Sequence, residues 1–116
     1  IEKLQQAGCE VFPIGRTKTG VDLKELMKLL GEKGIDSILL EGGSSLNYSA
    51  LQAGIISKVE TYIAPKIFGG ELAKTPVGGI GVEEPEQAFF LKNPKITQIE
   101  QDILMEWEVG TCSRES

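Results

Sequence analysis

The chain has 116 residues, of which 41% are hydrophobic and 25% charged, and its formal net charge is −5. This size and composition are those of a single globular domain with one core. The acidic balance and the absence of a Lys/Arg cluster argue against nucleic acid as a partner. The chain contains no histidine, which excludes Ser-His-Asp and Cys-His catalysis.

The two cysteines, Cys9 and Cys112, are far apart in the sequence. No Cys-x-x-Cys or Cys/His spacing is present, so no metal site is predicted. Reduced thiols in a cytoplasmic protein are the simplest interpretation, and a Cys9–Cys112 disulfide is the alternative. No apolar run reaches the roughly 20 residues that a membrane-spanning helix needs, and no signal peptide is visible. We therefore expect a cytoplasmic protein without a membrane segment.

Apolar periodicity and glycines predict an alternation of helices and strands in the first part of the chain. The chain begins without methionine in what reads as the last turns of a helix ended by Gly8, and we interpret it as lacking earlier elements. Asp22 is predicted to cap a helix. In chain order, the predicted elements are a strand over 9–14, a polar loop over 15–20, a helix over 23–33, a strand over 37–40, a helix over 45–53 and a strand over 58–64.

The second part of the chain changes character. Residues 67–86 are rich in glycine and proline and are predicted to be mostly loop. Strands are predicted over 88–92, 95–101 and 103–109, and Trp107 is expected in the core because apolar and acidic residues alternate around it. The βαβαβ order of the first part predicts parallel strands joined by right-handed crossovers. The fold class is therefore α/β, parallel first and antiparallel last.

One junction carries the strongest functional signal. An apolar strand ends at Glu41 and is followed by Gly42, Gly43 and a hydroxyl-rich helix start. Glycine permits a sharp turn and leaves no Cβ in the way of a ligand. Ser44 or Ser45 is predicted to cap the helix, and the free amides and dipole of its first turn favour a phosphate. The alternative is a structural turn with a solvated carboxylate.

Three segments together resemble a known family. They are Leu-Glu-Gly-Gly-Ser-Ser-Leu-Asn at 40–47, Ala-Gly-Ile-Ile at 53–56 and Tyr-Ile-Ala-Pro-Lys-Ile-Phe-Gly-Gly at 62–70. The chain resembles, over nearly its whole length, the reductase domain of bacterial bifunctional riboflavin biosynthesis deaminase-reductases. It has neither the His-x-Glu nor the Pro-Cys-x-x-Cys signature of the zinc deaminase half. It also resembles only the C-terminal part of the reductase domain, without the first half.

The resemblance implies a dihydrofolate-reductase-like three-layer fold, truncated at its N-terminus, with residues 1–116 forming one domain. It implies NADPH-dependent reduction of 5-amino-6-(5-phosphoribosylamino)uracil, a pyrimidine ribosyl-phosphate, to the ribitylamino compound. It further implies a homodimer. Two alternatives stay open: a non-catalytic oligomerisation or scaffold unit, and another α/β domain that binds a nucleotide or a sugar phosphate.

The resemblance also implies a set of site residues. Glu41 would bind the substrate or donate a proton, and both roles stay open. Leu46 reads more readily as a core residue, Tyr48 as either core or ligand contact, and Asn47 as either a ligand contact or an ordinary helix residue. Independently of the resemblance, Lys66 could face a phosphate and Arg16 and Lys18 could approach the cofactor 2′-phosphate, because all three follow predicted strands; solvated loops are the simpler interpretation. The residues expected around the NADPH diphosphate are Gly43, Ser44, Ser45, Leu46, Asn47, Tyr48 and Ser49.

Overall fold

The computed structural model describes residues 1–110, which divide into two compact units at Leu39/Leu40. The first unit holds the helices α1 (Glu2–Gln6) and α2 (Leu23–Glu32) and a two-residue-per-strand hairpin, β1 (Arg16–Thr17) and β2 (Gly20–Val21). The second holds α3 (Ser44–Ala53), β3 (Lys58–Ile63), the 3₁₀ turn η1 (Pro85–Gln87), β4 (Leu91–Ile99) and β5 (Asp102–Val109). The expectation that 1–116 form one domain stays a prediction.

Helix α2 forms where the sequence predicts it, and for the predicted reason. The carboxylate of Asp22 accepts hydrogen bonds from the amides of Lys24 and Glu25, both at 3.1 Å. These amides have no partner within the helix, so the cap stabilises its first turn. The apolar stripe of α2 is half-buried, with no residue fully enclosed.

The predicted strand over 9–14 is wrong. Residues 9–15 are not in a ladder and lie along α2 instead: the amide of Gly15 donates to Glu25 at 2.9 Å, and the ammonium of Lys33 lies 3.2 Å from Glu10 and 4.4 Å from the ring centroid of Phe12. A strand needs a neighbouring backbone for its N–H and C=O groups. Within residues 1–110 no segment supplies one here, so side-chain contacts to the helix take its place.

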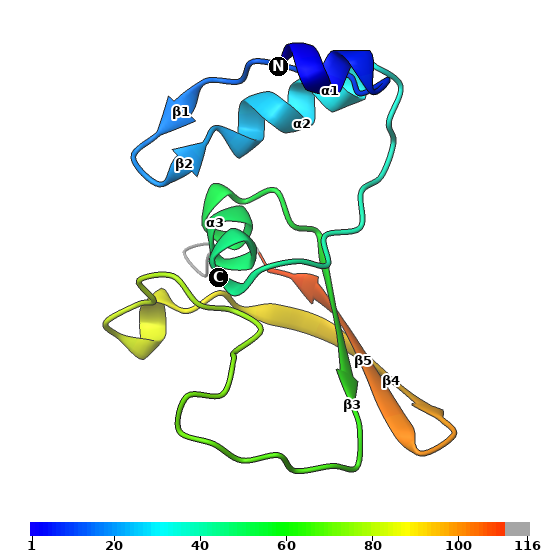
Figure 1. Ribbon diagram of the computed structural model, residues 1–116. Helices are drawn as coiled ribbons and strands as arrows, with labels where there is room; N and C mark the ends of the chain where they lie inside the picture. Colours follow the sequence, from blue (N-terminus) through cyan, green and yellow to red (C-terminus); the bar gives the residue numbers. More distant parts are fainter. Residues whose placement is uncertain (111–116) are drawn as a thin grey trace. The chain divides into compact units, whose positions relative to one another are not determined.

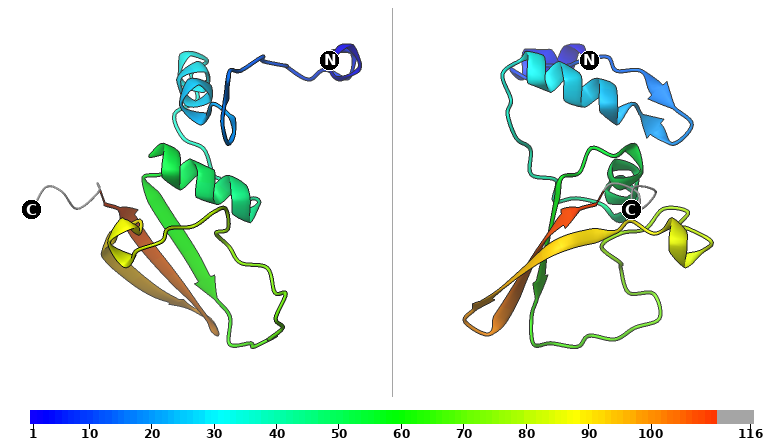
Figure 2. Two further views of the ribbon diagram at one scale, coloured as in Figure 1. Left: turned by 90° about the vertical axis from the view of Figure 1, so that its left-hand side faces the viewer. Right: turned by 180° about the vertical axis from the view of Figure 1, so that it is seen from behind.

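The second unit is built on a three-stranded antiparallel sheet in the order β3-β5-β4 (Figures 1 and 2). The mixed α/β class and the antiparallel C-terminal strands are confirmed. The parallel pairing and the strand predicted over 37–40 are wrong for the part described: residues 35–43 lie outside any ladder, and every strand pair in 1–110 is antiparallel. The apolar run at 37–40 lacks a partner strand, and Leu39 is 75% exposed.

The C-terminal hairpin differs from prediction in one respect. Residues 91–99 form one strand instead of two, and Asn93-Pro94 makes a bulge where the register shifts between Lys92 and Lys95. Asn93 has a φ of +52°, and its side-chain Nδ2 donates to the carboxylate of Glu108 at 2.9 Å. Proline is tolerated here because β4 is an edge strand of the sheet.

The two faces of this sheet have opposite character. Residues paired directly across antiparallel strands point to the same face. The register therefore groups Lys58, Glu60, Glu106 and Lys95 on one face, and Val59, Trp107, Met105 and Ile96 on the other. Trp107 is half-buried and not enclosed as a core residue would be.

Helix α3 carries the best-buried side chains of the described chain. Tyr48 is 7% exposed and Ala50 is 1% exposed. Leu46, expected in the core, is 43% exposed, because it lies two residues before Tyr48 and so points away from the buried side of the helix. Gly54 ends α3 in the left-handed conformation, as predicted. No helix in residues 1–110 has the length and apolar character to cross a membrane.

Candidate functional site

The start of α3 presents unpaired backbone donors. Gly43 occupies the cap position with φ +78° and ψ 120°, and no side chain caps the helix. The first amide in α3 with a backbone acceptor is that of Asn47, which donates to the carbonyl of Gly43 at 2.9 Å. The amides of Ser44, Ser45 and Leu46 have no acceptor among the described residues. The prediction that Ser44 or Ser45 caps the helix is wrong, because Gly43 takes that position.

This cap leaves the helix end open to a ligand. The hydroxyl oxygen of a serine cap would have accepted a hydrogen bond from one of these amides. With glycine, three consecutive N–H groups and the positive end of the helix dipole remain available to an anion. Gly43, Ser45 and Leu46 are exposed and Ser44 is half-buried. The start of α3 therefore has backbone donors of the kind that bind anions, and the expected diphosphate contact stays a prediction.

Asn47 contributes a further polar atom to this helix end. Its Nδ2 donates to the carbonyl of Pro76 at 2.9 Å, whereas its Oδ1 is buried and has no hydrogen-bond partner. A buried acceptor without a donor is costly.

Tyr48, by contrast, is a packing residue. Its hydroxyl donates to the carbonyl of Gly81 at 2.9 Å, and its ring meets Phe89 edge-on at a centroid distance of 5.9 Å. The side chain is buried and its one polar atom is satisfied within the protein. Of the two readings that the sequence left open, the structure supports the core role.

A second segment, residues 76–81, lies against the same helix and is called the covering loop below (Figure 1). The amide of Gly78 donates to the carbonyl of Ser44 at 3.0 Å. Together with the bonds from Asn47 and Tyr48, this attaches the loop to the first turns of α3. Sequence reasoning predicted a loop but no contact with α3; the density of glycines at 78, 79 and 81 was the available signal for close backbone approach.

The remaining predicted residues lie in different parts of the chain. Glu41 is exposed and lies outside any helix or strand, shortly before the start of α3. Lys66 is exposed in the loop after β3. Arg16 and Lys18 belong to the hairpin of the first unit. Cys9 is exposed, and Cys112 lies outside the described residues, so their pairing stays open.

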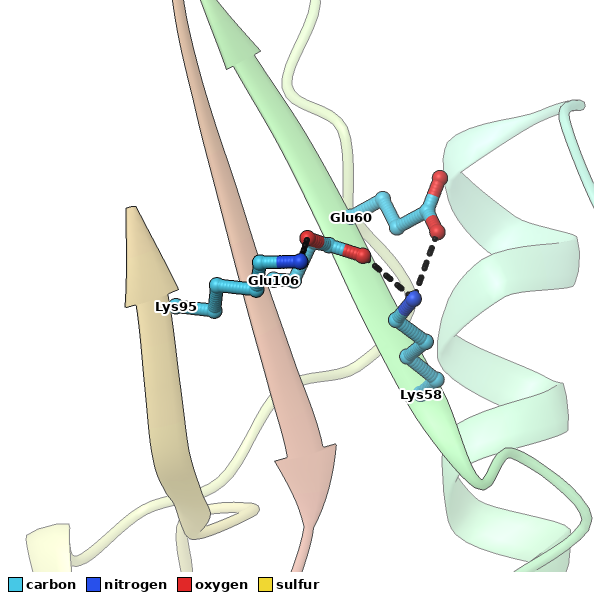
Figure 3. A network of polar contacts seen from close by, with 4 residues as sticks. All are labelled: Lys58, Glu60, Lys95 and Glu106. Carbon is cyan, nitrogen blue, oxygen red and sulfur yellow. Dashed lines mark hydrogen bonds and ion pairs between the residues drawn. The ribbon is translucent and has the colours of Figure 1, made fainter. Parts of the chain in front are cut away.

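Four charged side chains form a cluster on the sheet (Figure 3). The sequence analysis assigned none of them a function. The ammonium of Lys58 contacts the carboxylates of Glu106 and of Glu60, the latter at 3.0 Å, and Lys95 lies 3.8 Å from Glu106. The hydrogen bond with Glu106 raises the pKa of Lys58, and the same bond lowers the pKa of Glu106. The groups are solvent-accessible, so we interpret the cluster as a structural cross-strand network.

Comparison with known proteins agrees with the sequence reading. The RibD C-terminal domain family matches residues 1–105. The chain is 48% identical over 109 residues to riboflavin biosynthesis protein RibD of Actinobacillus pleuropneumoniae, covering 94% of this chain and 29% of that protein. It is 40% identical over 89 residues to 2,5-diamino-6-ribosylamino-4(3H)-pyrimidinone 5′-phosphate reductase of Methanothermobacter thermautotrophicus, covering 77% of this chain and 41% of that protein.

The fold comparison points the same way. The solved structure of Acinetobacter baumannii RibD, form 2, superposes with a TM-score of 0.76 at 25% identity, covering 95% of this chain and 29% of that one. The chain thus spans less than half the length of these relatives. The extent of the family match and the identity to the relatives show that the chain belongs to the RibD C-terminal domain family.

Proposed function

We propose that this chain is part of a reductase of riboflavin biosynthesis and contributes the diphosphate-binding segment of its nicotinamide cofactor site. The observation that carries the proposal is the start of α3, where Gly43 leaves the amides of Ser44, Ser45 and Leu46 without an internal partner. Two relatives that match over most of this chain are named as a pyrimidinone phosphate reductase. A reductase of this kind needs a hydride donor, and a helix end with free amides suits the diphosphate of an anionic cofactor.

The cofactor we propose is NADPH, which when bound supplies the hydride. The helix-start amides would bind its diphosphate, and Ser44, Ser45 and Asn47 would add hydroxyl and amide groups around it. Leu46 would cover the ligand with its exposed side chain. Ser49, the last residue of the expected segment, would be the contact farthest from the helix start. Tyr48 is retained as a supporting residue, because its hydroxyl and ring are already engaged inside the protein.

The substrate we propose is 5-amino-6-(5-phosphoribosylamino)uracil, reduced to the ribitylamino compound. The reductase relatives are named for a 2,5-diaminopyrimidinone, which carries an amino group at ring position 2 where the uracil compound carries an oxygen, so both compounds need to be tested. Glu41 is the carboxylate nearest in sequence to the helix start. We propose that it binds the ribosyl hydroxyls or protonates the departing ring oxygen or nitrogen. A cytoplasmic homodimer is part of the same proposal.

Titration calorimetry with NADPH, and separately with NADH, tests the cofactor site in the full chain. Ser45→Asp places a carboxylate beside the helix-start amides and is expected to abolish NADPH binding, since like charges repel and the aspartate occupies the free donors. Gln52→Asp is the matched control: it adds the same charge to the exposed C-terminal turn of the same helix and should leave the dissociation constant within about twofold. A folded protein that binds neither cofactor would overturn the proposal.

Activity is measured by loss of NADPH absorbance with the uracil and the diaminopyrimidinone substrates offered in parallel. Reduction of the uracil compound alone supports the assignment, and reduction of the diaminopyrimidinone alone would correct the substrate. Simple phosphates or nucleotides that bind as tightly as NADPH would favour the alternative of a general sugar-phosphate-binding domain. A clean dimer without cofactor binding would favour the scaffold alternative.

A further inference from the structure

The covering loop touches α3 at three successive levels. The amide of Gly78 donates to the carbonyl of Ser44 at 3.0 Å, Asn47 donates to Pro76 at 2.9 Å, and the Tyr48 hydroxyl donates to Gly81 at 2.9 Å. All three helix residues belong to the segment proposed above to bind the cofactor. The loop therefore contacts the first turns of α3 through the Ser44 carbonyl and the side chains of Asn47 and Tyr48. Ser45 and Leu46 stay exposed.

Gly78 makes the closest of these approaches to the helix start. A Cβ at this position would lie 3.0 Å from Oγ and 3.2 Å from Cβ of Ser44, and 3.7 Å from its carbonyl carbon. The first two distances are shorter than normal contact, whereas the third is ordinary. The side chain of Ser44 therefore sets how closely residue 78 can approach.

We infer that Gly78 is a positioning residue for the cofactor site: by contacting Ser44 without a side chain, it fixes the direction of the free amides at the start of α3. The inference rests on the proposed cofactor site. The first turn of a helix frays readily, because its amides have no internal partners. A bond to the Ser44 carbonyl from outside the helix restrains that turn, and preorganised donors bind an anion better than mobile ones.

A double-mutant cycle on NADPH affinity, measured by calorimetry in the full chain, tests the inference. Gly78→Ala in the wild-type background is expected to weaken binding about tenfold, since the new methyl displaces Ser44 and with it the amides. Ser44→Gly removes both atoms that the methyl would meet while keeping the amide. In the Ser44→Gly background, Gly78→Ala should therefore change the affinity by less than about twofold.

Each outcome has a distinct meaning. No NADPH or NADH binding by folded wild-type protein overturns the proposed cofactor site together with this inference. Wild-type binding that Gly78→Ala leaves unchanged overturns the inference alone. An equal loss in both backgrounds also overturns it, because the effect would then not pass through Ser44. Gly31→Ala, at a helical glycine with nothing within 4 Å of the added Cβ, is the control for the substitution itself.

Hydrogen exchange of the wild-type protein provides a second measurement that does not depend on folding of the variants. Addition of NADPH should slow exchange in the peptide covering 44–49 and also in the peptide covering 76–81, because the two are linked through Ser44, Asn47 and Tyr48. Protection of the helix peptide without any change in the loop peptide would overturn the inference.

Discussion

The ring of Tyr48 fills the space that a side chain at position 79 would need. A Cβ on Gly79 would lie 2.2 Å from Cδ1 and 2.4 Å from Cγ of Tyr48, and Gly79 has a φ of +75°. Both facts require glycine: one for lack of space, the other because L-residues with side chains rarely adopt this backbone conformation. The contact joins α3, at the candidate cofactor site, to the covering loop.

Gly79→Ala should therefore destabilise the protein. The added methyl must displace a buried aromatic ring, and the alanine must keep an unfavourable positive φ. Together these effects cost about 2–4 kcal/mol in the free energy of unfolding. Denaturant unfolding followed by Tyr and Trp fluorescence measures the loss as a lower midpoint. Gly31→Ala, which adds a methyl in open space inside α2, should be neutral or stabilise by about 0.5–1 kcal/mol. Equal midpoints for the two variants would contradict the contact.

Tyr48→Phe separates the hydroxyl from the ring. The variant loses the 2.9 Å bond to the Gly81 carbonyl but keeps the edge contact with Phe89. The expected loss is about 1 kcal/mol in the free energy of unfolding. Tyr62→Phe serves as the control, since Tyr62 is 63% exposed and should change the unfolding free energy by less than about 0.5 kcal/mol. A neutral Tyr48→Phe would show that the bond to Gly81 contributes nothing.

Asp22→Ala removes the cap of α2. Two amides, those of Lys24 and Glu25, lose their acceptor, and the expected cost is about 1 kcal/mol, within a range of roughly 0.5–2 kcal/mol. The helical signal in far-ultraviolet circular dichroism should be lost at a lower denaturant concentration than in the wild-type protein. Asp36→Ala removes the same charge from a position outside any helix and should leave the midpoint unchanged; an equal shift would attribute the effect to charge instead of the cap.

The Lys58–Glu106 pair should make stability depend on pH at both extremes. The lowered pKa of Glu106 contributes stability above the ordinary carboxyl range, and this is lost as the pH falls through the lowered pKa. The raised pKa of Lys58 contributes stability at pH values below the ordinary titration range of lysine, and this stability is lost as the pH rises through the raised pKa. Between these limits the contribution is constant.

Glu106→Gln should weaken both limbs of this profile, the acid limb most directly. The measurement is the thermal midpoint as a function of pH at low and high salt. Glu71→Gln, at an exposed loop carboxylate without an ion pair in the described residues, is the control and should retain the acid limb of the wild type. An unchanged acid limb in Glu106→Gln would show that other carboxylates dominate acid unfolding.

Local signals in the sequence located several elements well. The cap at Asp22, the apolar stripe of α2, the C-terminal glycine of α3 and the turn of the β4–β5 hairpin all depend on residues close in the chain. The Gly42-Gly43 junction also marked the start of α3. Local chemistry fixes these features, because caps and turns are satisfied by neighbours within a few residues.

Which strands pair with one another could not be predicted from such local signals. The apolar runs at 9–14 and 37–40 have the composition of strands, yet no described segment pairs with them. Whether an apolar run becomes a strand depends on a partner backbone elsewhere. The bulge at Asn93-Pro94 shows the reverse case, in which an expected break is absorbed because β5 continues to pair on both sides of it.

The sequence by itself determined the family, the helix start with its glycine and serines, and the antiparallel end of the chain, because these depend on residue type and short spacing. Only the tertiary structure decided that Leu46 is exposed while Tyr48 is buried, and that the covering loop is attached to α3 through Ser44, Asn47 and Tyr48. These outcomes depend on which distant segments approach within van der Waals contact, and no local pattern encodes that distance.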